Sequence, residues 1–116
     1  MPIKHIRFLS REPISQPDNF LEMRRLITGE DSNGDISITW VAIKGDHKKL
    51  YTMRSMRIYY VATGTLEFED ENGERVLAEE NDLVVIPKGT PYRFCGEATY
   101  LVINVPAYRE GDDVYL

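Results

Sequence analysis

Hydrophobic and polar residues alternate over most of the chain beyond residue 35, and this pattern predicts short β-strands. Residues 36–43 (ISITWVAI) are β-branched or aromatic at most positions, as are the later runs MRIYYVAT, LVVIP and YLVINVP. Turn-forming clusters separate the runs, namely TGEDSNGD, KGDHKK, EEND, KGTP and CGEAT. We expect KGDHKK and CGEAT to end the strands that precede them. Strands with this spacing are typical of an all-β sandwich or barrel.

The stretch TLEFEDENGERVLA contains the clearest local signal, an Asn72-Gly73 pair between two strand-like runs. Both residues tolerate positive φ angles, so the pair predicts a β-hairpin closed by a type I′ turn. The register that follows places Glu71 opposite Glu74, Asp70 opposite Arg75, and Phe68 opposite Leu77.

The N-terminal part of the chain has a different character. Three of the six prolines fall within residues 1–20, which indicates an extended arm with turns, and residues 19–27 fit either a helical turn or a strand. We expect residues 1–35 to form an N-terminal arm and first strands that pack on the barrel or on a partner subunit. Residues 36–106 would then form the barrel and residues 107–116 a C-terminal tail.

The composition says more about the location and the partners of the protein than about a reaction that it could catalyse. A chain of 116 residues with 42% hydrophobic and 28% charged residues fits one globular domain. The net charge of -5 and the scattered cations argue against binding to nucleic acid. The single cysteine, Cys95, excludes an internal disulfide bond, and no apolar run is long enough to cross a bilayer. A cytoplasmic protein without a nucleic-acid or membrane partner is the expectation.

Two segments resemble the sequence motifs of the cupin superfamily. YYVATGTLEF resembles the end of the first motif, where a strand runs into a glycine, here Gly64. NDLVVIPKGTPYRF resembles the second motif, in which a turn and an apolar strand lead to Pro-x-Gly. The resemblance covers roughly residues 50–106 and implies a cupin double-stranded β-helix, a small single-domain jelly-roll barrel of the RmlC-like type.

The positions at which this family binds a metal ion are replaced here. The family's first motif usually supplies His-x-His and a glutamate seven residues before the glycine, and its second motif supplies one more histidine. The corresponding residues in this chain are Tyr51, Met53, Arg57 and Tyr92, and the only histidines are His5 and His47. A permanent cation at the position of the anionic ligand disfavours a divalent metal. The prediction is therefore no metal and no other cofactor.

The orientation of Arg57 separates two interpretations. Alternation alone would direct Arg57 to solvent, because the neighbouring set that contains Met56, Ile58 and Tyr60 is more apolar. The resemblance instead implies that Arg57 faces the barrel lumen. A buried guanidinium needs an anionic partner, either a carboxylate of the protein or an anionic ligand. The apolar outer face would then be covered by a second copy or by the N-terminal arm. Small cupins commonly dimerise in this way, so the resemblance implies a homodimer.

The resemblance implies a ligand site in the lumen. The predicted ligand-binding residues are Arg57, Tyr51, Tyr59, Tyr92, Trp40, Met53 and Phe94. Tyr92 and Tyr51 are the predicted catalytic acids, with a pKa lowered by Arg57. His47 lies among charged residues and is predicted at the surface, yet it is the only histidine near enough to the motifs to act as a base. Glu67 and Glu97 are weaker alternatives for that base.

Three functions are compatible with these residues. The first is a protein that binds a small polar or anionic molecule and acts as a metal-independent isomerase, epimerase or cyclase; some cupin-like sugar-nucleotide epimerases combine a His base with a Tyr acid. The second is a non-catalytic ligand-sensing or dimerisation module. The third is a metalloenzyme with rearranged ligands that include His47.

Overall fold

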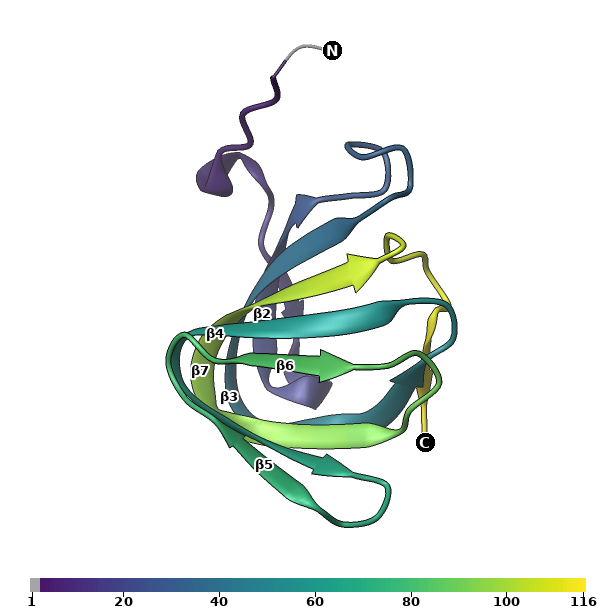
Figure 1. Cartoon of the computed structure of the whole chain (residues 1–116). Coiled ribbons are helices and arrows are strands. Elements are labelled where there is room, and N and C mark those ends of the chain that lie inside the picture. The colour runs from purple at the N-terminus through teal and green to yellow at the C-terminus, as the bar shows by residue number, and fades with distance from the viewer. Residues whose placement is uncertain (1–2) are drawn as a thin grey trace.

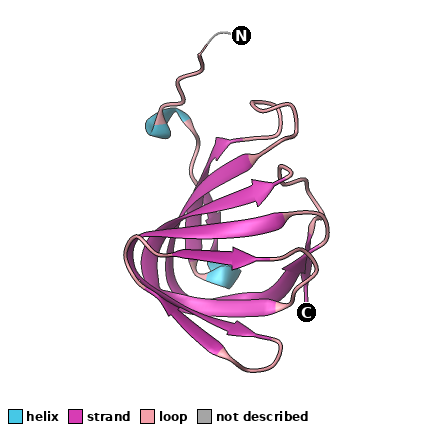
Figure 2. Cartoon of the chain, in the orientation of Figure 1, coloured by secondary structure: helices cyan, strands magenta, loops and turns pink. Residues whose placement is uncertain are grey.

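The computed structural model describes residues 3–116 and consists mainly of antiparallel β-strands, with 58% of the residues in strands and 5% in helical turns (Figures 1 and 2). The elements in chain order are η1 (Phe8–Ser10), β1 (Ile14–Gln16), η2 (Pro17–Asn19), β2 (Leu21–Ile27), β3 (Ser37–Thr52), β4 (Met56–Asp70), β5 (Arg75–Ala78), β6 (Leu83–Ile86), β7 (Tyr92–Val105) and β8 (Asp113–Tyr115). The predicted all-β class is confirmed. Neither of the helical turns within residues 3–116 has the length and apolar character needed to cross a membrane.

One curved sheet encloses the interior. Its strand order is β1-β2-β3-β7-β4-β5, with β6 paired to β4 and β8 paired to β3. The three long strands β3, β7 and β4 lie side by side at the centre, and they bend so that one face of the sheet becomes the inside of a barrel (Figure 1). The short strands β6 and β8 then close parts of the perimeter.

Alternation along the strands determines the core. In the first half of β4 the buried residues are Arg57, Tyr59 and Val61, and Leu66 and Phe68 are buried in its second half, whereas Met56 at the start of the strand is exposed. The prediction from the resemblance that Arg57 faces inward is therefore confirmed, and the prediction from apolar content alone is wrong. The buried hydrophobic cluster comprises Leu21, Met23, Val41, Ile43, Leu50, Tyr59, Val61, Leu66, Phe68, Ala78, Ile86, Tyr92, Phe94, Ala98 and Tyr100.

The predicted breaks at KGDHKK and CGEAT are wrong. Strands β3 and β7 remain paired through both segments, with Gly45 opposite Gly96 and His47 opposite Phe94. Two glycines that face each other let the strand pair bend as one ribbon, so the turn-forming residues produce curvature instead of a loop. A register irregularity follows between His47 and Leu50.

The β4–β5 hairpin differs from its predicted register by one residue. Phe68 pairs with Val76 and Glu69 pairs with Arg75. The carboxylate of Asp70 accepts hydrogen bonds from the backbone N–H groups of Asn72 (2.9 Å) and Glu74 (3.0 Å), which holds a longer loop. Within that loop Gly73 has the positive φ angle and Asn72 does not, so the type I′ turn is wrong as well.

The N-terminal segment packs on the outside of the sheet. Phe8 contacts Trp40 edge-to-face with ring centroids 5.0 Å apart, and the Arg24 guanidinium lies 4.8 Å above the Phe8 ring. Residues 21–27, left open between helix and strand, form β2, and β1 extends the sheet beyond it. The homodimer stays a prediction.

Gly64 and Gly73 give a matched test of close backbone approach. Both have positive φ angles, 78° and 80°, but a Cβ at Gly64 would overlap the carbonyl oxygen of Glu97, whereas one at Gly73 meets no atom within 4 Å. We expect Gly73→Ala to lower the free energy of unfolding by about 1 kcal/mol from backbone strain alone. Gly64→Ala should cost about 3 kcal/mol or more, because the steric overlap adds to that strain. Urea denaturation measures both values, and equal losses would contradict the close approach of β4 and β7.

Candidate functional site

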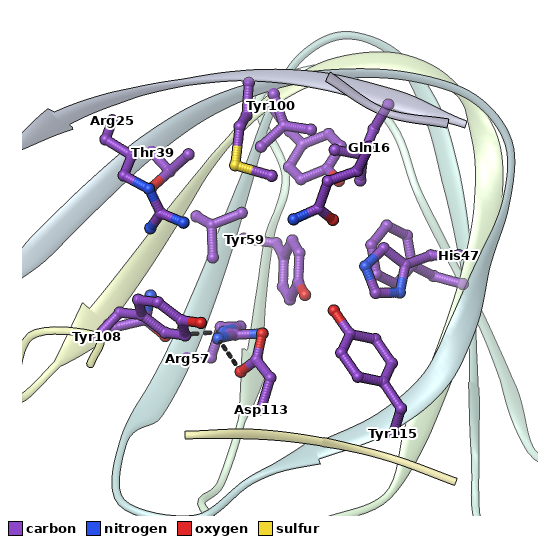
Figure 3. A pocket seen from close by; sticks show the side chains of 16 residues that line it. Gln16, Arg25, Thr39, His47, Arg57, Tyr59, Tyr100, Tyr108, Asp113 and Tyr115 are labelled. Atoms are coloured by element: carbon purple, nitrogen blue, oxygen red, sulfur yellow. Dashed lines mark hydrogen bonds and ion pairs between the residues drawn. The ribbon is translucent and has the colours of Figure 1, made fainter. Parts of the chain in front are cut away.

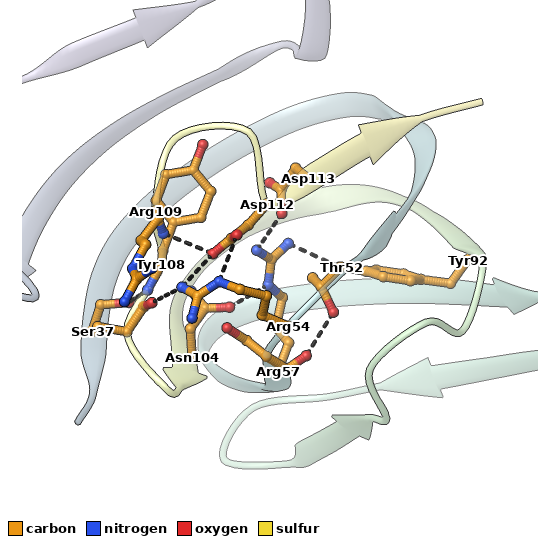
Figure 4. Close-up of polar contacts among 12 residues, drawn as sticks. Ser37, Thr52, Arg54, Arg57, Tyr92, Asn104, Tyr108, Arg109, Asp112 and Asp113 are labelled. Atoms are coloured by element: carbon orange, nitrogen blue, oxygen red, sulfur yellow. Dashed lines mark hydrogen bonds and ion pairs between the residues drawn. The ribbon is translucent and has the colours of Figure 1, made fainter. Parts of the chain in front are cut away.

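Arg57 is the central polar residue of the interior. The residue is 5% exposed, and each guanidinium nitrogen has a partner (Figure 4). Nε donates to Asn104 Oδ1 (2.8 Å), Nη1 donates to the Tyr92 hydroxyl (3.2 Å), and Nη2 donates to Asp113 Oδ1 (2.7 Å). Burial disfavours the charged form, but Tyr92, Tyr59 and Asp113 outweigh it and raise the pKa of Arg57 well above its ordinary value. The anionic partner required by a buried guanidinium is therefore a carboxylate of the protein, Asp113.

The C-terminal tail is held by two consecutive ion pairs. Asp112 accepts two hydrogen bonds of 2.9 Å from Arg54, one from Nε and one from Nη2. The Arg109 backbone N–H donates a further bond to Asp112 (2.8 Å). The hydrogen bonds from Arg54 are the main reason why the pKa of Asp112 is lowered. This clamp, together with the pairing of β8 on β3, places Asp113 against Arg57 (Figure 4).

Aromatic rings fill the interior beside Arg57. The hydroxyls of Tyr59 and Tyr92 lie 2.5 Å apart, and both rings pack against Phe94. Burial raises the pKa of Tyr92, and the nearby cation of Arg57 only partly opposes this effect. Burial likewise raises the pKa of Tyr59 well above its ordinary value. Arg57 does act to lower the pKa of Tyr92, as predicted, but the expected net lowering is wrong, because desolvation of the phenolate is the larger effect.

A cavity of about 90 Å³ remains on the other side of Arg57 (Figure 3). Its apolar lining residues belong to β2, β3 and β7, whereas its polar lining residues come from these strands and also from β1, β4 and the tail. The polar or ionisable residues that line it are Gln16, Arg25, Thr39, His47, Arg57, Tyr59, Tyr100, Asn104, Tyr108, Asp113 and Tyr115. Hydrogen-bonding groups from distant segments therefore converge on one small space, as in sites for small polar ligands.

His47 lies at one end of this cavity beside Tyr115. Its imidazole stacks on Phe94 with ring centroids 4.7 Å apart and an interplanar angle of 14°, and the Tyr115 ring lies 6.1 Å away. Burial lowers the pKa of His47 below its ordinary value of 6.5, and the charge of Arg57 acts in the same direction. The predicted surface position of His47 is wrong because β3 continues through KGDHKK and turns this side chain inward.

Four of the predicted ligand-binding residues lie in the barrel interior. Arg57, Tyr59 and Phe94 line the cavity. Tyr92 is buried behind them, where it contacts Arg57 and Tyr59.

Three of the predicted residues do not face the lumen. Met53 is 58% exposed, since it lies in the turn after β3. Tyr51 alternates with the buried Leu50 and Thr52 and so lies on the opposite face of β3. Trp40 faces outward against Phe8. Their predicted places at the site are therefore corrected.

Several residues at the site could not be found from the sequence. Asp113 and Tyr115 belong to a short tail strand. Asn104 lies near the end of β7, far from Arg57 in the sequence, and Arg25 lies in a segment with an ambiguous pattern. No local motif relates these residues to Arg57, because their proximity depends on the long-range pairing of β8 with β3 and of β4 with β7.

The side chains at this position do not fit a metal ion. Within residues 3–116, no group of three His, Cys, Asp or Glu side chains is placed to hold one. The guanidinium of Arg57 occupies the centre of the polar cluster, and its neighbours are phenols, one amide and one carboxylate. A divalent cation next to this fixed positive charge would be strongly disfavoured.

No family model and no curated protein matches this sequence. Solved structures match it in fold. Streptomyces PAC13 with uridine, as a Tyr→Phe variant, has a TM-score of 0.86 at 21% identity and covers 100% of this chain and 92% of that chain. Further PAC13 structures with uridine carry another Tyr→Phe change or a His→Gln change, and Pac13 is described as a unique nucleoside dehydratase.

Two other solved structures also match this chain in fold. Ectoine synthase from P. lautus has a TM-score of 0.77 at 17% identity and covers 100% of this chain and 90% of that chain. KdgF from Halomonas sp. has a TM-score of 0.77 at 17% identity, with 94% and 97% covered. All of these are cupin-fold proteins, and at such identities the likeness concerns the fold alone.

Asp113→Asn tests the buried ion pair. The change keeps the shape of the side chain but leaves the Arg57 charge without its anion, so we expect a loss of about 3 kcal/mol in the free energy of unfolding. Glu69→Gln is the matched control, since Glu69 pairs with Arg93 at the surface and water screens that pair. Denaturant titration should show a much smaller loss for the control. Similar losses in the free energy of unfolding for both variants would show that water screens the Arg57–Asp113 pair as much as it screens the surface pair.

The lowered pKa of His47 predicts a pH-dependent stability. Below pH 6.5 the unfolded chain takes up a proton at this histidine before the folded chain does, so protonation favours unfolding. The free energy of unfolding should therefore fall as the pH drops from 6.5 through the folded pKa. His47→Gln should remove that part of the decrease, measured by urea denaturation across this pH range. A His47→Gln profile parallel to that of the unaltered protein would contradict the burial of His47.

Proposed function

Because this chain has the cupin fold, we propose that it binds a small polar molecule in the cavity and that His47 transfers a proton in a reaction that needs no metal ion. The observation that carries the proposal is the position of His47 in the cavity wall together with its hydrogen bond to the backbone. The proposed reaction class is a dehydration or isomerisation, in which a base removes a proton and an acid returns one.

The hydrogen bond of His47 assigns its tautomer. Nδ1 lies 2.8 Å from the carbonyl oxygen of Lys48, and a carbonyl can only accept, so Nδ1 carries the proton. Because burial lowers the pKa of His47, the ring is neutral near pH 7. Nε2 then has a free lone pair with which it can accept a proton from a bound molecule.

Tyr115 is the proposed acid or hydrogen-bond donor opposite this base. Burial raises the pKa of Tyr115, so its hydroxyl stays protonated near neutral pH. Its ring lies 6.1 Å from that of His47, and Figure 3 shows its hydroxyl directed into the cavity. Tyr92, the acid predicted from the sequence, is buried behind the cavity wall and takes the role of positioning Arg57.

The likeness to PAC13 supports a nucleoside-like ligand. That protein is crystallised with uridine, and its variants alter two tyrosines and one histidine, the same residue types that line the cavity here. A polyhydroxylated ring would suit the mixture of hydroxyl, amide and imidazole groups around the cavity.

The packed half of the lumen favours a second candidate, a non-catalytic ligand-sensing module. Tyr59, Phe68, Tyr92, Phe94 and Tyr100 form one contiguous aromatic cluster that fills much of the interior. A module of this kind would bind the same molecule without converting it. The homodimer and a cytoplasmic location remain parts of the proposal.

His47→Gln separates the two candidates. We expect uridine to bind the unaltered protein in a calorimetric titration, and mass spectrometry of a panel of nucleosides and hydroxylated carbonyl compounds to detect loss of water or isomerisation. His47→Gln should lower that rate about 100-fold or more while uridine affinity changes little, because general-base catalysis is lost. The control is His5→Gln, which alters an exposed histidine and should leave the rate unchanged.

Two results would count against the enzyme. Unchanged turnover in His47→Gln would remove this residue from the chemistry. Binding of uridine without conversion of any compound in the panel would favour the ligand-sensing module.

A further inference from the structure

Arg25 lines the end of the cavity that lies away from His47. It belongs to β2, where it pairs with Thr39 of β3, and its guanidinium lies 5.1 Å above the ring of Tyr108. Thr39 is near the start of β3, and His47 lies eight residues later, beyond the bend at Gly45, so the two residues line different ends of the cavity. Figure 3 shows Arg25, Thr39 and Tyr108 on one side and His47 and Tyr115 on the other.

The charge of Arg25 is not neutralised by the protein. The other cation of the cavity, Arg57, is paired with Asp113, and elsewhere Arg54, Arg11 and Arg93 pair with carboxylates. Among residues 3–116, Arg25 forms no ion pair and no side-chain hydrogen bond, and its contact with Tyr108 is a cation–π interaction. A ring face can orient a guanidinium but leaves its N–H donors free.

The availability of these donors decides which arginine can bind an anion. The Arg57 guanidinium already donates to an amide, a phenol and a carboxylate, and the Asp113 carboxylate neutralises its charge, so Arg57 attracts an incoming anion less strongly than an unpaired arginine does. Arg25 is half-buried at the cavity wall with an unused planar fork. This fork matches two oxygens of a carboxylate or a phosphate, and a bond of this kind is stronger when partly shielded from water.

We propose that Arg25, with Thr39 and Tyr108 beside it, binds an anionic group of the ligand, either a carboxylate or a phosphate, while the uncharged part of the ligand extends along the cavity to His47. This inference rests on the proposed function for the location of the reacting end. It adds that the substrate is an acid, and that its charge lies at the end opposite the proton transfer.

The test is a direct titration of the full chain with simple anions. The Nε–Hε resonances of the arginine side chains are followed by NMR while inorganic phosphate or sodium acetate is added up to about 100 mM. We expect a saturable shift of the Arg25 signal with at least one of these anions. Arg25→Gln should weaken that anion's binding, followed by the resonances of Thr39 and Tyr108, about tenfold or more.

Arg24→Gln is the matched control. Arg24 is the adjacent residue of β2, faces the outside of the sheet and stacks on Phe8, so its replacement makes the same change in net charge without altering the cavity. Anion binding should persist in this variant. Saturation by phosphate but not acetate would assign the group as a phosphate, and the reverse result would assign a carboxylate.

Two outcomes would overturn the inference. One is the absence of any saturable shift of Arg25 with both anions, and the other is equal anion affinity in Arg25→Gln and the unaltered protein. Because the titration needs no turnover, its result is independent of the proton transfer. Anion binding at Arg25 with full activity in His47→Gln would refute the proposed function alone, and the opposite pair of results would refute the anion site alone.

Discussion

A guanidinium buried in an aromatic interior must be neutralised, and this requirement connects the barrel to its C-terminal tail. Arg57 cannot lose its proton, and within residues 3–116 the carboxylate that reaches it is Asp113. Asp113 can do so only when β8 is paired with β3 and Asp112 is held by Arg54. The tail is therefore part of the site, and the same strand brings Tyr115 to the cavity beside His47. The pairing of Arg57 with Asp113 thus also places Tyr115, the proposed acid, at the cavity.

The interior divides into a packed part and an open part, and the boundary is the polar cluster around Arg57. On one side, Tyr59, Tyr92 and Phe94 are large enough to fill the lumen, and the two hydroxyls satisfy each other and Arg57. On the other side, smaller residues such as Val41 and Thr39 leave room for a ligand. The polar atoms of the packed side are bonded within the protein, so they serve to fix Arg57 and its surroundings. Under the proposed function, recognition of the ligand falls to the groups on the open side, whose hydrogen-bonding capacity is still available.

The sequence was sufficient for the fold class and for the residue at the centre of the site. Period-two alternation identifies which residues share a face, but it does not say which face is inside. For Arg57 the alignment with the cupin motifs predicted the buried face correctly, whereas the apolar content of the two faces did not. The bends at Gly45 and Gly96 were misread as breaks, because their effect depends on the two glycines facing each other across a strand pair. The predicted register of the β4–β5 hairpin was wrong for a similar reason. Its loop is determined by hydrogen bonds to the Asp70 carboxylate and not by the Asn-Gly pair. Asp113 could not be inferred at all, because no local pattern indicates which aspartate will meet which arginine.

The arrangement of charge in the cavity differs from that of the chain as a whole. The Arg57–Asp113 pair contributes no net charge, and His47 is neutral near pH 7, so Arg25 leaves the cavity locally positive. The chain itself carries a net charge of -5, which repels an approaching anion at long range. At physiological ionic strength this repulsion is screened beyond about 8 Å, whereas a contact at the partly buried Arg25 is screened much less. An anionic ligand would therefore gain its affinity from short-range bidentate hydrogen bonds inside the cavity and not from electrostatic steering. The cavity would then select among anions by their shape and by how well their oxygens fit the Arg25 donors, and not by their charge alone.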